Sequence, residues 1–389
     1  MTHVSTSAPT SQVHSLPPAQ WLPVAGAFAV QGLLFIGMTT NVPALQHRFE
    51  LGELGLTLIL LAMVLLSGAG SVLAEQIAAR HGSATALRIG LSGLAIGVAG
   101  IGLAPSLAAL GGGVTAYGLA VGMVDAASNM QGIALEHRAG RTLLPRLHAG
   151  WTTGGILATV LALLTGGAPL AWAVAPLAIV PVLLLTASFQ RHDTPADAGE
   201  TNTVPWRQIS LVGAALVLFY MVDTAAATWG PVFLHTVHGL AVGSVAWATL
   251  PYLVATLAAR IGAAATLARL GGPRTISLGA LIAAAALALL VASPSAPVAV
   301  AAFALLGLGV GVIAPLSFTA AARLAGGPGA DRARLDAVVA RFNQFNYAGA
   351  LIGAVMTGLV GSGNLRLGFA VPMVLILGIL PLARQFATR

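Results

Sequence analysis

Long runs of apolar residues, separated by short polar or glycine-rich breaks, dominate the hydropathy pattern of this chain. Twelve runs are long enough to cross the roughly 30 Å of hydrocarbon in a bilayer as α-helices. They cover residues 21–45, 53–77, 84–104, 108–136, 147–168, 170–189, 208–234, 242–268, 275–293, 296–323, 337–360 and 365–385. The pattern predicts an all-α membrane protein with twelve transmembrane helices.

The one long polar break inside this pattern covers residues 190–206 and divides the chain into two halves of six runs each. The predicted domains are an N-terminal six-helix half at 21–189, this linker, and a C-terminal six-helix half at 207–389. Residues 1–20 are polar and contain neither a cationic segment nor a small-residue cleavage site. We therefore expect a disordered tail there and not a signal peptide.

The two halves repeat at one constant offset, which we call the repeat register. It matches Arg80 with Arg269, Gly82 with Gly271, and Gly118–Gly122 with Gly307–Gly311. An ungapped register through a loop and two spans predicts two pseudo-symmetric six-helix halves. This is a transporter architecture, in which the solute site lies at the midplane between the halves.

A polar cluster in the fourth span does not repeat. Asp125, Asn129 and Glu136 fall within about 60° of one another at 100° per residue. Asp125 matches Ala314 in the second half, and Asn129 matches Phe318. A carboxylate inside a membrane helix is costly and normally faces a bundle interior or a watery cavity. We expect Asp125 to line the pathway and carry the coupling proton, with Asn129 holding its carboxyl group or the solute.

Further polar side chains inside the spans are candidates for the same pathway. His148, Asp223 and Arg260 are expected to take part in proton coupling, and Arg260 to contact a carboxylate or a bound anion. The expected solute-lining residues are Gln31, Asn41, Trp151, Tyr220, Asn343, Asn346 and Tyr347. The structural alternatives are hydrogen bonding between helices, a snorkelling arginine, and anchoring of His148 and Trp151 at the membrane surface.

Composition agrees with a membrane protein, since 57% of the residues are hydrophobic and only 7% are charged. All eighteen basic residues are arginines, and fifteen lie in even-numbered connections or near the C-terminus, against Arg48 and Arg366 in odd-numbered ones. This bias places both termini and the linker in the cytoplasm. The arginines are spread along the chain, which argues against nucleic-acid binding. We expect a monomer in the bacterial inner membrane, with a small-molecule solute as its partner.

Missing residue types exclude several chemistries. Without cysteine there is no disulfide or zinc–thiolate site, and without lysine there is no phosphate-binding Walker loop. The chain also lacks a His-Glu-x-x-His or Gly-x-Ser-x-Gly motif. We therefore expect no enzyme, no catalytic or metal site and no cofactor, with a proton gradient as the source of energy.

The twelve spans, the central linker and the Arg-x-Gly pair at Arg80 and Gly82 resemble the major facilitator superfamily. The residues from Asp125 to Glu136, with Asn41-Val-Pro43, look like its YbjJ/MosC-type branch, which is related to fucose permeases. The resemblance implies the fold of this superfamily, with Arg80, Gly82, Arg269 and Gly271 as conformational loop motifs.

Together these features predict a secondary active transporter that works by alternating access, coupled to protons, for a small organic solute such as a sugar. Proton-driven efflux of an amphiphilic compound is the alternative. A non-transporting membrane sensor, an ion channel and a membrane-embedded enzyme are further readings, which the internal repeat and the short polar segments disfavour.

The arginine bias can be tested on the intact chain because it contains no cysteine. An Asp197→Cys variant places one thiol in the linker. We expect an impermeant maleimide to label it only after the cells are opened. Labelling from outside intact cells would reverse the predicted orientation.

Overall fold

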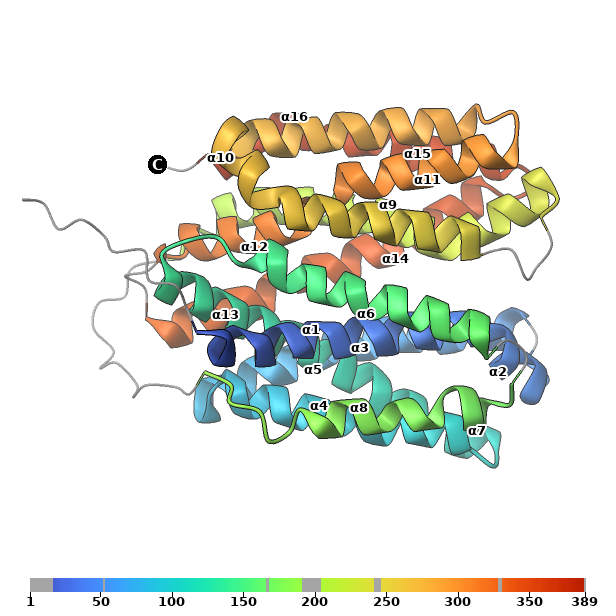
Figure 1. Ribbon diagram of the computed structural model, residues 1–389, viewed down its shortest axis with the longest axis horizontal. Helices are drawn as coiled ribbons and strands as arrows, with labels where there is room; N and C mark the ends of the chain where they lie inside the picture. The colour runs from blue at the N-terminus through green and yellow to red at the C-terminus, as the bar shows by residue number, and fades with distance from the viewer. Residues whose placement is uncertain are drawn as a thin grey trace, which may run out of the picture.

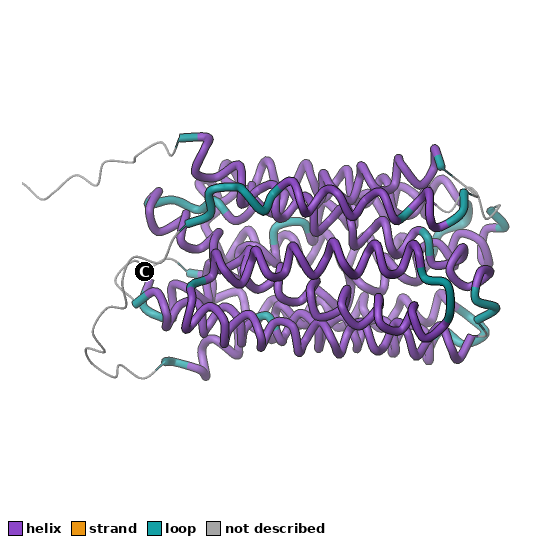
Figure 2. Tube along the Cα trace, turned by 90° about the horizontal axis from the view of Figure 1, so that it is seen from below, coloured by secondary structure: helices purple, strands orange, loops and turns teal. Residues whose placement is uncertain are grey.

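The protein is described by a computed structural model that covers residues 17–51, 53–165, 168–190, 204–240, 246–327 and 331–387. Most of the predicted tail (1–20) and linker (190–206) lies outside these residues. The described chain is all-helical, and the helices run along the long axis of the molecule (Figures 1 and 2). The prediction of an all-α fold is confirmed.

The first half forms the lower part of the bundle in Figure 1. Its helices are α1 (Pro18–Thr40), α2 (Val42–Arg48), α3 (Glu53–His81), α4 (Ser83–Leu103), α5 (Leu107–Ala139), α6 (Leu144–Leu164), α7 (Leu170–Ala173), η1 (Ala175–Ala178) and α8 (Ile179–Leu183).

Most of the second half forms the upper part of the same view, while α13 lies lower, at the level of α1. Its helices are α9 (Trp206–His238), α10 (Ala246–Val291), α11 (Ala296–Val310), α12 (Ile313–Leu324), α13 (Arg332–Phe342), α14 (Gln344–Val360), α15 (Leu365–Leu375), η4 (Ile376–Gly378), α16 (Ile379–Leu382) and η5 (Ala383–Phe386).

Within the described residues, nine helices are long and apolar enough to cross a membrane, against twelve predicted spans. One of the nine, α10, covers two predicted spans, because only Gly271 (φ 74, ψ 168) leaves the helical conformation between them. The sixth and eleventh spans are assembled from the shorter pieces α7–η1–α8 and α13–α14. Prolines without an N–H interrupt the sixth, at Pro176 and Pro181, and the eleventh breaks at Asn343. The numbers twelve and nine therefore differ because some spans are joined into one helix and others are divided into short helices.

The predicted repeat register recurs in the packing of the two halves. Ser67 of α3 donates its hydroxyl hydrogen bond to Gly118 O of α5 at 3.1 Å, and Thr256 of α10 donates to Gly307 O of α11 at 3.3 Å. In the repeat register, the donor Ser67 matches Thr256 and the acceptor Gly118 matches Gly307. Helix pairing follows the same rule, since α1 packs on α6 as α9 packs on α14. The repeat thus extends from sequence to hydrogen bonds.

The loop glycines of the two halves also match in conformation. Gly82 has φ 81 and ψ 152, close to the φ 74 and ψ 168 of Gly271. Positive φ of this size is strained for residues with a Cβ, so glycine is required at both sharp turns between neighbouring helices. Arg80 and Arg269, which come just before these glycines, lie at the same end of the bundle.

Arg48 and Arg366, the two arginines of odd-numbered connections, bind the ends of equivalent helices. The four acceptors are the carbonyl oxygens of Gly102 and Ala104 for Arg48, and of Val291 and Ser293 for Arg366. These carbonyls are at a helix C-terminus, where they have no intrahelical donor and where positive charge is favourable. The two pairs of acceptors match in the repeat register, although the two arginines come from unrelated positions.

The opposite end of the bundle carries the start of α1 and the boundaries of the linker, and we call it the linker end. Gln190 donates to Gln20 O at 3.4 Å there, and Arg341 lies 5.6 Å from the Trp206 ring. In Figure 1 it is at the left, with α2 and α7 at the right.

Close helix packing in the first half depends on Gly122. A Cβ at this position would lie 1.8 Å from Ser67 O, a backbone atom that cannot rotate away. We expect Gly122→Ala to lower the free energy of unfolding by about 1–3 kcal/mol, measured by thermal unfolding in detergent. Gly262, which has nothing within 4 Å of a Cβ, is the matched control, and Gly262→Ala should be neutral or stabilising. Equal loss in both variants would contradict the packing argument.

Candidate functional site

The hydrogen bonds that join the two halves gather between the middle of the bundle and the linker end. Ser71 donates to Ala340 O at 3.2 Å, and Gln344 donates to Gly68 O at 3.3 Å. Arg341 pairs with Glu75 at 3.1 Å, although this pair is largely exposed. The halves are therefore held together on the linker side of the midplane.

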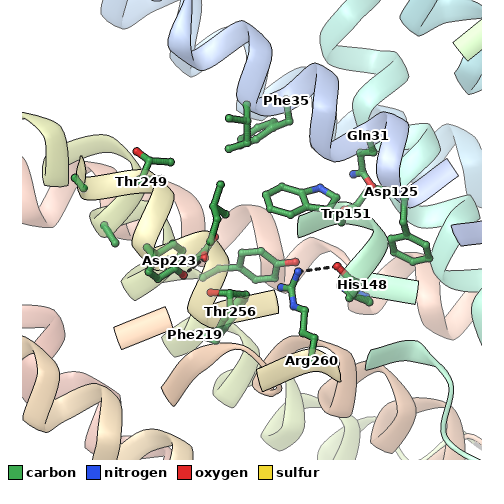
Figure 3. A pocket seen from close by; sticks show the side chains of 18 residues that line it. Gln31, Phe35, Asp125, His148, Trp151, Phe219, Asp223, Thr249, Thr256 and Arg260 are labelled. Atoms are coloured by element: carbon green, nitrogen blue, oxygen red, sulfur yellow. Dashed lines mark hydrogen bonds between the residues drawn. The ribbon is translucent and has the colours of Figure 1, made fainter. Parts of the chain in front are cut away.

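A cavity lies between the halves at the level where these bonds begin (Figure 3). It measures about 730 Å³ including its open mouth. Seven of the residues predicted from sequence line it together: Gln31, Asp125, His148, Trp151, Tyr220, Asp223 and Arg260. They come from α1, α5, α6, α9 and α10, so the cavity is shared by both halves.

The Asp125 carboxylate is the strongest link between the halves in this region. Its Oδ2 accepts hydrogen bonds from Asn343 Nδ2 at 2.7 Å, Asn346 Nδ2 at 3.0 Å and the Tyr347 hydroxyl at 3.3 Å. Asp125 belongs to α5 in the first half, and its three donors surround the break between α13 and α14 in the second. These donors do not line the cavity themselves; they act on it through Asp125.

Asn129 has a different role from the expected one. Its Nδ2 donates to the backbone oxygen of Asp125 at 2.9 Å, and its Oδ1 lies 3.2 Å from His148 Nε2. Because an amide oxygen only accepts, His148 carries its hydrogen on Nε2. Asn129 thus orients the His148 ring and does not hold the Asp125 carboxyl group.

A second carboxylate, Asp223, lines the cavity from the other half. Its Oδ1 accepts the hydroxyl hydrogen of Tyr252, which lies in α10. Tyr220, one turn before Asp223 on α9, lines the same cavity. The two acids are therefore presented from opposite halves, each with partners from a different helix.

Arg260 is buried at 5% exposure and reaches across to the first half. Its Nε donates to Gly311 O at 3.0 Å, and its Nη1 donates to His148 O at 2.9 Å and to the Thr152 hydroxyl. Gly311 O is available because the residue four positions later is Pro315, which has no N–H. The expected contact with an intramembrane carboxylate is absent among the described residues, and two carbonyl oxygens and a hydroxyl oxygen accept hydrogen bonds from Nε and Nη1 instead.

Two other predicted site residues lie away from the cavity. Glu136 accepts from the backbone N–H groups of Leu143 and Leu144, at 2.6 and 2.8 Å, and from Thr319 of the second half. It therefore caps the start of α6 at the linker end. Asn41 donates to Gly37 O at 2.8 Å at the end of α1. Neither side chain lines the cavity.

Several lining residues were not predicted from the sequence. The polar ones are Thr249, Tyr252 and Thr256 of α10, and the last two stand on the same face as Arg260 at spacings of four residues. That spacing could have been used to predict from the sequence that they share the cavity with Arg260. The aromatic residues Phe28, Phe35 and Phe219 carried no comparable signal, because an apolar side chain in a membrane span faces lipid or protein equally well.

Comparison with known proteins identifies the family. The model of the Major Facilitator Superfamily matches residues 147–354, more than half of the chain. The chain belongs to the Major Facilitator Superfamily. It is a membrane transporter of this family, and the expectation that it is not an enzyme is confirmed.

Relatives within the superfamily cover most of the chain. An uncharacterized MFS-type transporter of Yersinia pestis is 25% identical over 369 residues, covering 92% of this chain and 93% of that protein. An uncharacterized transporter of Sinorhizobium fredii is 25% identical over 325 residues, covering 78% and 82%.

Solved structures support the twelve-helix fold of the superfamily. The transporter FucP, crystallised in the outward conformation, has a TM-score of 0.74 at 16% identity and covers 95% of this chain and 99% of its own. The human organic anion transporter TETRAN has a TM-score of 0.73 at 13% identity, covering 95% and 100%.

The bonds to Asp125 should contribute to stability. Asn343→Ala removes the shortest of the three, and a hydrogen bond to a charged group contributes roughly 1.5–3 kcal/mol. We expect a loss of this size in thermal unfolding in detergent. Gln344→Ala, which removes a neighbouring bond to a neutral carbonyl, should lose less, about 0.5–1.5 kcal/mol. The reverse order would show that the carboxylate network does not hold the halves together.

Proposed function

We propose that this protein is a proton-coupled secondary transporter of a small polar organic solute such as a sugar, and that Asp125 carries the coupling proton. It works by alternating access, with the two six-helix halves moving about the central cavity. The observation that carries the proposal is the Asp125 carboxylate, which lines the cavity and is bound by three donors of the opposite half.

This geometry links proton binding to movement of the halves. An ionised carboxylate is a strong acceptor and strengthens each bond to Asn343, Asn346 and Tyr347. A protonated carboxyl group is a weaker acceptor and adds a donor of its own. Protonation of Asp125 therefore weakens the attachment between the halves, and a proton taken up in the cavity favours their separation on the linker side.

In this proposal the linker end and both termini face the cytoplasm of a bacterial inner membrane, and the arginine bias supports this orientation. Since the bonds between the halves gather at that end, the described arrangement is closed toward the cytoplasm. A monomer is sufficient for this function, because the cavity is formed within one chain. The resemblance to the YbjJ/MosC-type branch, and the similarity in fold to a fucose:proton symporter of E. coli, support uptake with protons.

A second hollow supports the alternative of amphiphile efflux. It lies between α3 and α14 and is lined mainly by apolar side chains, with Gln344 and Tyr347 at its polar end. Tyr347 also donates to Asp125. An amphiphilic compound that entered between these helices would contact Tyr347, one of the donors to Asp125.

The proposal is tested with Asp125→Asn in proteoliposomes, using a panel of radiolabelled sugars and related solutes. Asparagine has nearly the volume of a protonated aspartate but cannot release a proton. We expect proton-driven accumulation to fall to the level of liposomes without protein, while solute exchange persists because it needs no net proton movement.

Glu50→Gln is the matched control, since Glu50 is exposed and does not line the cavity. It should retain accumulation. If Asp125→Asn transports with an unchanged pH dependence, Asp125 only holds the helices together, and Asp223 is the next carboxylate to test.

A further inference from the structure

Arg260 keeps part of its hydrogen-bonding capacity for something outside the protein. A guanidinium group has five N–H donors. Nε uses one on Gly311 O, and Nη1 uses two, on His148 O and the Thr152 hydroxyl. The two N–H groups of Nη2 bind no acceptor among the described residues, and the side chain lines the central cavity.

The three bonds hold the guanidinium in a fixed place. Gly311 O lies at the break between α11 and α12, and His148 and Thr152 lie in α6 of the other half. Trp151 adds its ring, 5.9 Å from Arg260 Cζ. In Figure 3 the head of Arg260 points toward the cavity between Trp151 and His148. A group positioned in this way loses little entropy when it binds a ligand.

The charge of Arg260 has no direct counterion. No carboxylate of the described chain lies within ion-pair distance of it, and arginine stays charged at all relevant pH values. Its present acceptors are neutral. A buried guanidinium group with no carboxylate in contact is costly, so an anion that bound it in the cavity would gain a strong partner.

Gln31, which lies in α1 of the first half, offers the complementary feature. Its side chain is 6% exposed and lines the same cavity, and its Oε1 accepts no hydrogen bond from the described residues. A buried amide oxygen without a donor is unfavourable. A ligand hydroxyl would supply the missing donor.

We propose that the solute is a hydroxy monocarboxylate, of which a sugar acid is the type, with its carboxylate on Arg260 and a hydroxyl group on Gln31. This rests on the proposed transport function and narrows its substrate class. Trp151 and Phe35, whose ring centroids are 6.1 Å apart, give the carbon skeleton an aromatic wall. A single negative charge fits better than a dianionic phosphate, because Asp223 lines the same cavity.

The test measures binding to the purified full-length protein in detergent at pH 7, by quenching of tryptophan fluorescence and by calorimetry. The probes are matched pairs of an acid and its neutral counterpart: galacturonate with galactose, gluconate with glucitol, and mandelate with phenylethanediol. For at least one pair, we expect the acid to bind roughly tenfold or more tightly, as a charge-assisted hydrogen bond implies. If no acid binds more tightly than its neutral partner, the proposal is wrong.

Variants locate the preference. Arg260→Gln should bind acid and neutral partner equally weakly, and Arg260→Lys should keep part of the preference. Arg88→Gln is the matched control, because Arg88 also donates to carbonyls, of Leu185 and Ala187, but does not line the cavity. An acid preference that survives in Arg260→Gln would overturn the assignment. Should that variant fail to fold, Gln31→Leu, which should lower affinity for the acids roughly threefold to tenfold, keeps the site testable.

Failure of this proposal is distinguishable from failure of proton coupling. Acid preference is measured without a membrane or a gradient, whereas coupling is measured with Asp125→Asn in proteoliposomes. A protein that prefers acids but shows no proton-driven accumulation would retain the Arg260 site and lose the role of Asp125.

Discussion

A charged side chain buried inside a membrane bundle has little access to water, so dipoles of the protein must stabilise it. The centre of this transporter obeys that constraint in two ways. Asp125 receives three donors from the opposite half, and Arg260 receives carbonyl and hydroxyl oxygens from both halves. Both charges therefore bind the halves to one another while lining the cavity between them. A change in either charge, by a proton or by a ligand, acts on the contact between the halves without any relay.

The symmetry of the fold explains where these contacts fall. Ser71 and Arg260 match in the repeat register, and each crosses to the other half. Ser71 binds Ala340 O, while Arg260 binds around Trp151, the counterpart of Ala340. Equivalent helices of the two halves are thus joined twice at equivalent levels, once by a small hydroxyl and once by a guanidinium group. The first merely packs two helices together, and the second places a charge in the cavity.

Much of this was predictable from the sequence, and the remainder depended on three-dimensional detail. Span positions, the repeat register and the gathering of Asp125, Asp223 and Arg260 followed from hydropathy, repetition and the cost of buried charge. The capping role of Glu136 did not, because helical spacing assigns a face but not the depth at which that face meets a neighbouring loop. The partners of Arg260 were missed for a related reason. A free backbone carbonyl depends on the proline four residues later, which becomes relevant only when the two helices are seen side by side.

Pro315 has a counterpart in the first half, and that counterpart is Ala126. Together with Asp125, opposite Ala314, this makes two adjacent positions at which the repeated halves differ in chemistry. Asp125-Ala126 supplies a carboxylate on an unbroken helix. Ala314-Pro315 supplies no charge, but Pro315 leaves the Gly311 carbonyl free to bind Arg260. Two equal copies of a six-helix unit would need to diverge at few sites to gain a polarised cavity. Substitutions at Asp125-Ala126 and Ala314-Pro315 would therefore change the solute that the cavity binds while the helical scaffold stays the same.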